Sequence, residues 1–125
     1  MRKSIEAANV ACNAVTALVN DGSTFATGRL NVYDIDSTII TRLPLSIPAF
    51  RDATDGTAVA NFIYDATAYR DATAVLYDIS NRDSVVTWDG TVSTFSGIGD
   101  FKLNSVILSQ DSTVAVTYGF YAVPR

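Results

Sequence analysis

The C-terminal stretch, Phe101 to Pro124, constrains the fold more than any other part of the chain. Two apolar runs flank a polar turn at Ser109 to Ser112, and the second run, Thr113 to Val123, alternates strictly. Alternation with a period of two is typical of a β-strand with one buried face. At about 3.3 Å per residue this run would span roughly 35 Å, long enough to cross a small domain. One parity of the run comprises Val114, Val116, Tyr118, Phe120 and Ala122; we expect Val114, Val116, Tyr118 and Phe120 to face inward and Tyr121 to lie on the other face.

After Gly22 the chain continues as short alternating runs separated by Gly, Asp, Asn, Ser and Pro. A spacing of about 8 to 12 residues between such runs is typical of a sandwich or barrel. The pattern therefore predicts a mainly β fold, an antiparallel, jelly-roll-like β-sandwich of about seven to eight strands with one N-terminal α-helix. We expect a single domain over residues 1–125, with the helix at 4–20 and the sandwich at 28–124. The predicted strands are 28–33, 39–45, 57–64, 72–79, 84–88, 101–108 and 113–123.

Turn residues mark the boundaries of these strands. Asp55-Gly56 and Asp89-Gly90 are typical turn dipeptides, and residues 80–83 form a polar loop of hairpin length. Pro44 and Pro48 frame the segment 44–50, and a proline donates no hydrogen bond to a central ladder. We expect this segment to lie at an edge or to leave the sheet.

Residues 4–20 form the one stretch with helical periodicity. Ser4 is a suitable N-cap, Glu6 suits the first turn, and Gly22 suits the position after the last turn. The stripe predicted to be buried comprises Ile5, Ala8, Cys12, Val15 and Val19, widened by Ala11 and Leu18, with Glu6, Asn9, Asn13 and Thr16 elsewhere. The alanine content lets this helix approach a sheet, or a copy of itself, closely.

Composition argues against several classes of function. The chain has 125 residues, a net charge of −4 and scattered Lys and Arg, which disfavours nucleic-acid binding. No apolar run approaches the length of a membrane span, and the N-terminus lacks the features of a signal peptide. The absence of histidine removes the commonest general base and metal ligand. Cys12, the single cysteine, has no intramolecular disulfide partner and no base to activate it, so we expect it in the core or in an interface.

The acidic residues define no catalytic or metal site by their spacing. Asp34 and Asp36, followed by Ser37, could offer oxygens to Ca²⁺, but no downstream glutamate completes the motif, since Glu6 is the only one. A solvated turn is the simpler interpretation. No spacing selects a general acid and base from the remaining carboxylates, so we predict no enzyme, no cofactor and no metal. The carboxylates considered are Asp52, Asp55, Asp65, Asp71, Asp78 and Asp83.

The order of the segments resembles a family of small virion proteins of tailed bacteriophages. The resemblance rests on the helix EAANVACNAVTALVNDGS, then GRLNVYD, LPLSIPAF, DGTAVAN, a DATA strand and WDGTV, and finally DFKLNSVILSQDSTVAVTYGFYAVP. It extends from about Ala7 to Pro124. Two places depart from the family pattern, Gln110-Asp111 in the last turn and Phe95 in the loop 91–99. The resemblance implies a compact β-sandwich with a structural role as a capsid cement or decoration protein, and it supplies no catalytic residue.

We therefore expect a virion structural protein on the capsid exterior, synthesised in the host cytoplasm. Its partners would be the major capsid protein and further copies of itself, with no nucleic acid and no membrane. The alternative is a tail, neck or fibre module that binds host-surface glycan through exposed Trp88 or Tyr69, although we expect Trp88 to cover the core. The candidate interface residues are Pro44, Ile47, Pro48, Phe50, Tyr64, Tyr69, Arg70 and Phe95.

Overall fold

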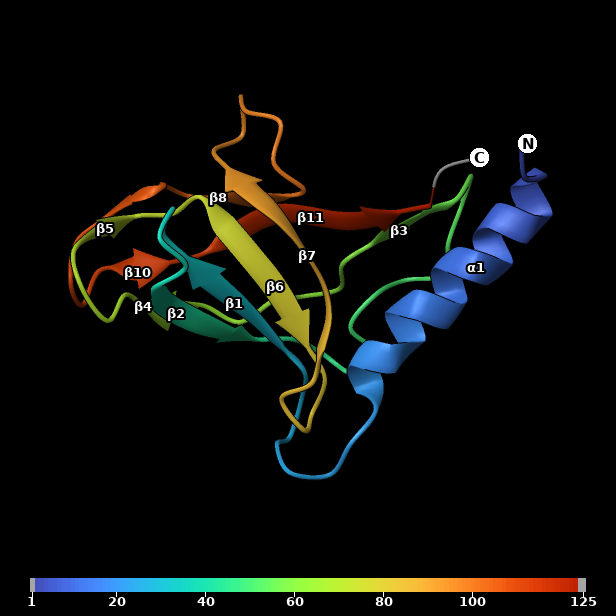
Figure 1. Cartoon of the computed structure of the whole chain (residues 1–125), viewed down its shortest axis with the longest axis horizontal. Helices are drawn as coiled ribbons and strands as arrows, with labels where there is room; N and C mark the ends of the chain where they lie inside the picture. The colour runs from blue at the N-terminus through green and yellow to red at the C-terminus, as the bar shows by residue number, and fades with distance from the viewer. Residues whose placement is uncertain (1, 124–125) are drawn as a thin grey trace.

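The computed structural model describes residues 2–123; Met1, Pro124 and Arg125 lie outside the described residues, as does the predicted sandwich boundary at residue 124. The N-terminal helix α1 (Ile5–Ala17) continues into a 3₁₀ turn, η1 (Leu18–Asn20). Ser4 is the N-cap, as predicted, and its hydroxyl accepts a hydrogen bond from the Ala7 N–H at 3.1 Å. The helix lies at one end of the molecule (Figure 1) and contacts strands β3 (Thr57–Val59) and β11 (Val116–Ala122).

Eleven strands lie within residues 2–123, and seven of them form one curled sheet in the order β2-β1-β6-β7-β8-β11-β3 (Figure 1). The pair β7 and β8 is parallel, and the other neighbours are antiparallel. The mainly β prediction is confirmed, but the sheet is mixed rather than purely antiparallel. Its remaining strands are β1 (Arg29–Tyr33), β2 (Ile39–Pro44), β6 (Leu76–Ser80), β7 (Val86–Ser93) and β8 (Phe101–Leu103).

Two short ribbons complete the fold. One pairs β4 (Ala66–Thr67) with β10 (Thr113–Val114), and the other pairs β5 (Ala72–Thr73) with β9 (Ile107–Leu108). The two C-terminal apolar runs therefore do not form one continuous hairpin. Only β8 and β11 pair with each other. The strands between them in the sequence, β9 and β10, pair instead with β5 and β4 in the segment 66–73.

The long terminal strand of the prediction is interrupted, and its parity changes. Val116 lies opposite Leu103 and Tyr118 opposite Lys102, so Thr117 is an extra residue, a β-bulge. A one-residue insertion exchanges the two faces of a strand. Val114 is buried and Val116 packs against the core as expected, but beyond the bulge the prediction is wrong. Tyr121 packs against the core, Tyr118 is 44% exposed, and Phe120 lies half-buried beside Tyr118 with ring centroids 6.0 Å apart.

The two predicted turn dipeptides have different outcomes. Asp55 and Gly56 both have positive φ and close a two-residue turn in which Thr54 and Thr57 exchange backbone hydrogen bonds, as predicted. Asp89-Gly90 instead lies inside β7, so this turn is wrong. A Cβ at Gly90 would meet Asp100 Oδ2 at 2.6 Å, with the Tyr77 ring close behind, and the glycine therefore makes room for these side chains.

One side of α1 packs on the body, and it differs from the predicted stripe. Ala8, Cys12, Thr16 and Val19 are buried, whereas Ile5 and Leu18 are 44% and 47% exposed. Thr16 tolerates burial because its hydroxyl donates to the Cys12 carbonyl at 3.1 Å. Cys12 is fully buried, in line with the expected core position, and burial raises the pKa of its thiol.

Three asparagine side chains fasten the helical segment to residues 49–56. The amide oxygens of Asn9, Asn13 and Asn20 accept the backbone N–H groups of residues 56, 53 and 49 at 2.7, 2.8 and 3.0 Å. Asn9 and Asn13 were predicted only to lie off the buried stripe, without a role. The three amide oxygens thus satisfy backbone N–H groups that face the helix, as a neighbouring strand would do in a sheet.

Candidate interaction surfaces

Five apolar residues form a patch where two loop segments lie side by side. Backbone hydrogen bonds join Tyr64 N to Pro44 O and Asn61 N to Ala49 O, both at 2.9 Å. Ile47, Phe62 and Tyr64 are each more than half exposed, at 53%, 64% and 51%. Phe62 and Tyr64 meet edge to face with ring centroids 4.8 Å apart. We name this surface the 44–64 patch, defined by Pro44, Ile47, Pro48, Phe62 and Tyr64.

Tyr69 and Arg70 lie at the other end of β2 and do not join this patch. Tyr69 is 53% exposed, and its N–H donates to the Ile40 carbonyl at 2.7 Å. Arg70 forms a salt bridge with Asp34 at 2.5 Å and also donates to the carbonyls of Ile39 and Thr38. Arg70, one of the predicted interface residues, is therefore already paired with a carboxylate of its own chain.

The acidic turn at Asp34 is held by the same arginine. The Arg70 guanidinium, followed by the Thr38 N–H, lowers the pKa of Asp34 below its ordinary value. The other carboxylate oxygen accepts the N–H groups of Asp36 and Thr38. Within residues 2–123, no three acidic, cysteine or histidine side chains gather as a metal site would require. Arg70 thus neutralises the carboxylate that the cation hypothesis needed.

Phe50 was predicted as an interface residue, and it lies in the core instead. It is 6% exposed and packs against Trp88 with ring centroids 5.5 Å apart. Trp88 also contacts Tyr121 at 4.6 Å and donates to the Tyr77 hydroxyl at 3.2 Å. Trp88 is therefore a core-covering residue, as expected. Sequence alone placed Phe50 in the Pro-framed segment without showing that the chain turns inward at residues 49 and 50.

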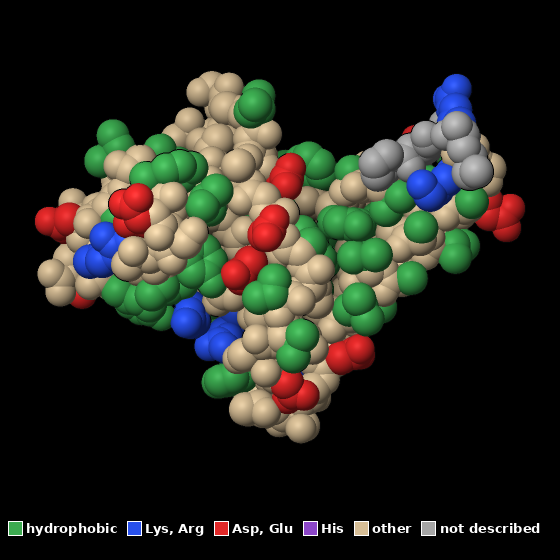
Figure 2. Space-filling model, viewed as in Figure 1, with side chains coloured by type: hydrophobic (Ala, Val, Ile, Leu, Met, Phe, Trp, Pro, Cys, Tyr) green, Lys and Arg blue, Asp and Glu red, His purple; other side chains and the backbone are tan. Residues whose placement is uncertain are grey.

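The loop between β7 and β8 projects from the body (Figure 1) and carries hydrophobic side chains at the surface (Figure 2). Phe95 and Ile98 are 82% and 97% exposed. The loop is nevertheless internally bonded. Gly97 N donates to Thr94 O at 3.0 Å, and the Lys102 ammonium donates to Gly97 O at 2.6 Å. We call residues 93–99 the projecting loop; it presents two apolar side chains from an ordered turn.

A groove of about 500 Å³ lies between the segment 59–65 and the bulged part of β11. Its apolar lining includes Val59, Phe62, Val116 and Tyr118. Two charged side chains, Arg51 and Asp65, also line the groove, and both residues are exposed.

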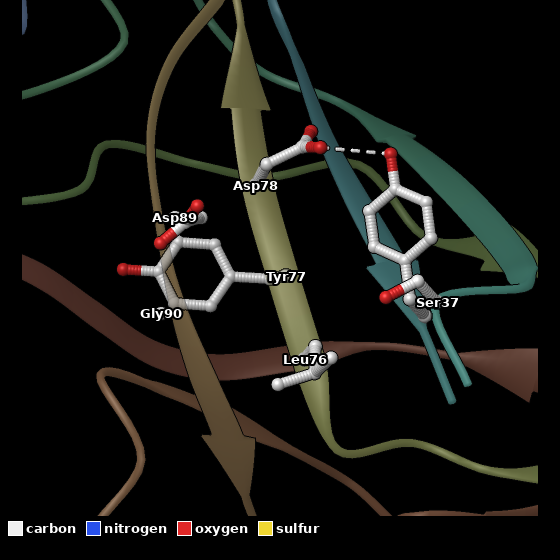
Figure 3. A pocket seen from close by; sticks show the side chains of 7 residues that line it. Ser37, Leu76, Tyr77, Asp78, Asp89 and Gly90 are labelled. Atoms are coloured by element: carbon white, nitrogen blue, oxygen red, sulfur yellow. Dashed lines mark hydrogen bonds between the residues drawn. The ribbon is translucent and has the colours of Figure 1, made fainter. Parts of the chain in front are cut away.

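A second hollow, of about 310 Å³, lies over β1, β6 and β7 (Figure 3). The Tyr33 hydroxyl donates to Asp78 at 2.8 Å, and Asn31 Nδ2 donates to the other oxygen of that carboxylate at 2.7 Å. Burial, then the bond to Asp78, raises the pKa of Tyr33 to about 12. The Tyr77 pKa is raised too, by burial and by its bond to Asp100. Both phenols thus stay protonated at neutral pH and act as hydrogen-bond donors rather than as bases.

Several aspartates fix loops instead of facing a shared substrate position. Asp83 accepts the N–H groups of Ser23 and Thr24 at 3.0 Å each, and these bonds lower its pKa. Asp71 accepts the Gln110 N–H at 2.7 Å. Asp83 and Asp71 therefore have a structural role, as acceptors for backbone N–H groups of the loops.

Sequence reasoning missed Phe62, Ile98 and the three asparagines. Phe62 falls within the predicted strand 57–64, which is wrong beyond Val59, where β3 ends. Ile98 lies in a Gly- and Ser-rich connection. The spacing of Asn9 and Asn13, four apart on one helix face, was a usable signal.

Comparison with known proteins adds no relative. The chain matches no protein-family model, no curated protein and no solved structure. Among residues 2–123, no helix is both long and apolar enough to cross a bilayer. What the fold and surfaces define is a mainly β domain with one N-terminal helix and exposed apolar patches.

Proposed function

We propose that this protein is a structural component of a tailed-bacteriophage virion, a cement or decoration protein that binds across major capsid protein subunits on the capsid exterior. The observation that carries the proposal is the 44–64 patch, where three large apolar side chains, each more than half exposed, lie on two hydrogen-bonded segments. Contiguous exposed apolar surface is typical of a protein interaction site. The order of the sequence segments, which resembles that of phage virion proteins, supplies the virion context.

The patch has the properties of an interface core. It pairs aromatic side chains with backbone segments fixed by hydrogen bonds, and its five residues carry no charge. Interface cores are enriched in aromatic residues and depleted in charged ones. A stable interface buries on the order of 1,200–2,000 Å² in total, so neighbouring surface would have to contribute as well.

The glycan-binding alternative has weaker support. It depends on aromatic side chains available for stacking on a sugar, but Trp88 packs between Phe50 and Tyr121. Tyr69 is exposed, and among residues 2–123 no second aromatic ring stacks against it.

We also propose that the two short ribbons serve as the second layer of an open β-sandwich. Ala68, Ala74, Leu108 and Val114, which lie in or beside the ribbons, are buried in the same cluster as Leu30 of β1. An experimental structure in which these ribbons lie away from the main sheet would contradict this classification.

Binding to purified particles tests the proposed function. The wild-type protein should be present in purified virions at a fixed ratio to the capsid protein, and particles lacking it should be less tolerant of heat. An Ile47→Ser/Tyr64→Ser variant should melt like the wild type but bind depleted particles at least tenfold more weakly. The matched control is Ile107→Ser, which changes an apolar residue 79% exposed outside the patch. Presence in infected lysate together with absence from purified virions would refute the proposal.

A further inference from the structure

The hollow over β1, β6 and β7 lies on the side of the sheet that faces away from the core (Figure 3). Tyr33 and Asp78, which line it, alternate along their strands with the buried residues Val32 and Tyr77. We propose that this hollow binds the guanidinium group of an arginine side chain presented by a partner protein, between Asp78 and Asp89 and beside the ring of Tyr33. None of the residues that line it belongs to the 44–64 patch, so the contact is separate from the proposed capsid interface.

The hollow is lined by two negative charges and by no positive one. Asp78 and Asp89 lie directly opposite each other in the β6–β7 pair, and Asp89 is exposed. Among residues 2–123, neither carboxylate forms a salt bridge. Figure 2 shows acidic side chains along the middle of this face, over the strands that Figure 1 labels β6 and β7, with no Lys or Arg among them. Like charges directly opposite each other destabilise a strand pair, and a bound cation would relieve that repulsion.

The basic residue in the same cross-strand row does not neutralise these carboxylates. The row runs across β2, β1, β6 and β7 as Arg42, Asn31, Asp78 and Asp89. Neighbouring strands are about 4.8 Å apart, which separates the backbones of Arg42 and Asp78 by roughly 10 Å. The two side chains form no salt bridge across Asn31. The sheet itself therefore supplies no counter-ion to the hollow, and its charge is complementary to a cation from another molecule.

The arrangement of the acceptors suits a guanidinium better than an ammonium or a metal ion. Directly opposed residues of a strand pair have Cβ atoms about 4.5–5.5 Å apart, so one planar group whose N–H donors form a fork can reach both carboxylates. An ammonium has no such fork. A Ca²⁺ ion takes about six to eight oxygen ligands, and within residues 2–123 no third carboxylate joins Asp78 and Asp89.

The lining of the hollow is already fixed before anything binds. The Tyr33 hydroxyl and Asn31 Nδ2 donate to different oxygens of Asp78, at 2.8 and 2.7 Å, and each oxygen keeps a second lone pair for a further donor. The Tyr33 ring offers a face on which a guanidinium can stack, and Leu76 offers apolar surface to the stem of the arginine. Groups that are held in place in advance lose little conformational entropy on binding.

The hollow suits a side chain of a protein better than a free amino acid. No Lys or Arg lines it, so the α-carboxylate of free arginine would find no partner there and would lie near two aspartates. Within a protein, that carboxylate is part of a neutral peptide bond. The volume of about 310 Å³ is at the small end of ligand sites, as suits a single inserted side chain.

An NMR titration of the full chain with N-acetyl-L-arginine amide, a blocked arginine, tests this binding. The backbone amide signals of Leu76, Asp89 and Gly90 should shift, with a dissociation constant of roughly 1–10 mM, and the affinity should fall as salt is added. N-acetyl-L-citrulline amide has nearly the same shape without the charge, and it should bind roughly tenfold more weakly. Blocked lysine should also bind more weakly than blocked arginine, and free L-arginine should bind no more tightly than the blocked form.

Asp89→Asn removes one charge from an exposed side chain, so it should weaken binding of the arginine probe roughly tenfold without lowering the melting temperature. The matched control is Asp52→Asn, which makes the same change at an exposed aspartate outside the hollow and should bind the probe like the wild type. The Ile47→Ser/Tyr64→Ser variant should also bind the probe normally, so failure of capsid binding and failure of arginine binding are distinguishable.

Four results would each overturn the inference. They are equal binding of the arginine and citrulline probes, equal binding of the arginine and lysine probes, an unchanged affinity in Asp89→Asn, and roughly tenfold tighter binding of free L-arginine than of the blocked form. The last of these would make the hollow a site for a small molecule instead of a docking site for a protein side chain.

Discussion

Replacing Gly119 by alanine tests how tightly the pair β8 and β11 is packed. Gly119 is buried opposite Phe101 in the β8–β11 pair, and a Cβ there would lie less than 3.0 Å from two ring carbons of Phe101. That ring is 0% exposed and is held edge-on by Tyr77, with centroids 4.8 Å apart. Gly119 is not among the glycines with positive φ, so alanine meets no backbone restriction. The effect of the substitution is therefore one of packing.

The expected magnitude follows from two opposing contributions. Overpacking a filled core lowers the free energy of unfolding by about 1–3 kcal/mol. Replacing glycine by alanine reduces the conformational entropy of the unfolded chain, which raises the free energy of unfolding by about 0.4–1 kcal/mol. We therefore expect a loss of about 0.5–2 kcal/mol. For a domain of this size, at about 4 °C per kcal/mol, the melting temperature should fall by roughly 2–8 °C.

A double-mutant cycle with Phe101→Leu, measured by thermal and urea unfolding, isolates the contact. The smaller side chain makes room for the new methyl group, so the double variant should be more stable than the sum of the single effects predicts by at least about 0.5 kcal/mol. Ala122→Ser, an exposed change on the same strand, should stay within about 0.5 kcal/mol of the wild type. An unchanged melting temperature for Gly119→Ala, or additive effects in the cycle, would refute the packing argument.

Three further predictions concern the helix, an acidic loop and the core. Asn9→Ala should destabilise by about 0.5–1.5 kcal/mol and speed hydrogen exchange at the Gly56 amide, whose acceptor it removes; unchanged exchange would contradict the asparagine contact. The lowered pKa of Asp83 means that its contribution to stability is present above the unfolded-state value near 3.8 and is lost as pH falls through the folded value. The melting-temperature difference between wild type and Asp83→Asn should therefore shrink below about pH 4, and a difference constant from pH 2 to 6 would count against it. Phe50→Ala should cost about 3–5 kcal/mol and shift Trp88 fluorescence to the red, whereas weaker particle binding at unchanged stability would restore Phe50 to the interface.

Features set by neighbouring residues were predictable from the sequence. The Ser4 cap, the helix, the departure of the chain from the sheet after Pro44, the last residue of edge strand β2, and the Asp55-Gly56 turn depend on local conformational preference, and all are present. Asp89-Gly90 fits the same local rule but forms no turn, because both residues pair with Asp78 and Tyr77 of β6. The glycine there leaves room for the side chains of Tyr77 and Asp100. Tertiary packing decided that position.

The features that sequence did not reveal depend on which distant segments pair. Alternation from Val114 to Ala122 is unbroken in the sequence, and only the register of β11 against β8 shows that Thr117 is inserted. The sequence indicates four of the five residues of the 44–64 patch, namely Pro44, Ile47, Pro48 and Tyr64. Their proximity to Phe62 follows from hydrogen bonds between residues 44–49 and 61–64, which the sequence does not show.

The parallel pairing of β7 with β8 has a consequence for how such a protein can diversify. Val92 lies beside Phe101 and Ser93 beside Lys102, so the chain leaves the sheet and re-enters it at almost the same place. A segment whose two ends are adjacent can be exchanged for one of different length or chemistry without altering the strands that flank it. The scaffold thus holds a natural grafting point, where a new tip would change the surface that the loop presents while the framework stays the same.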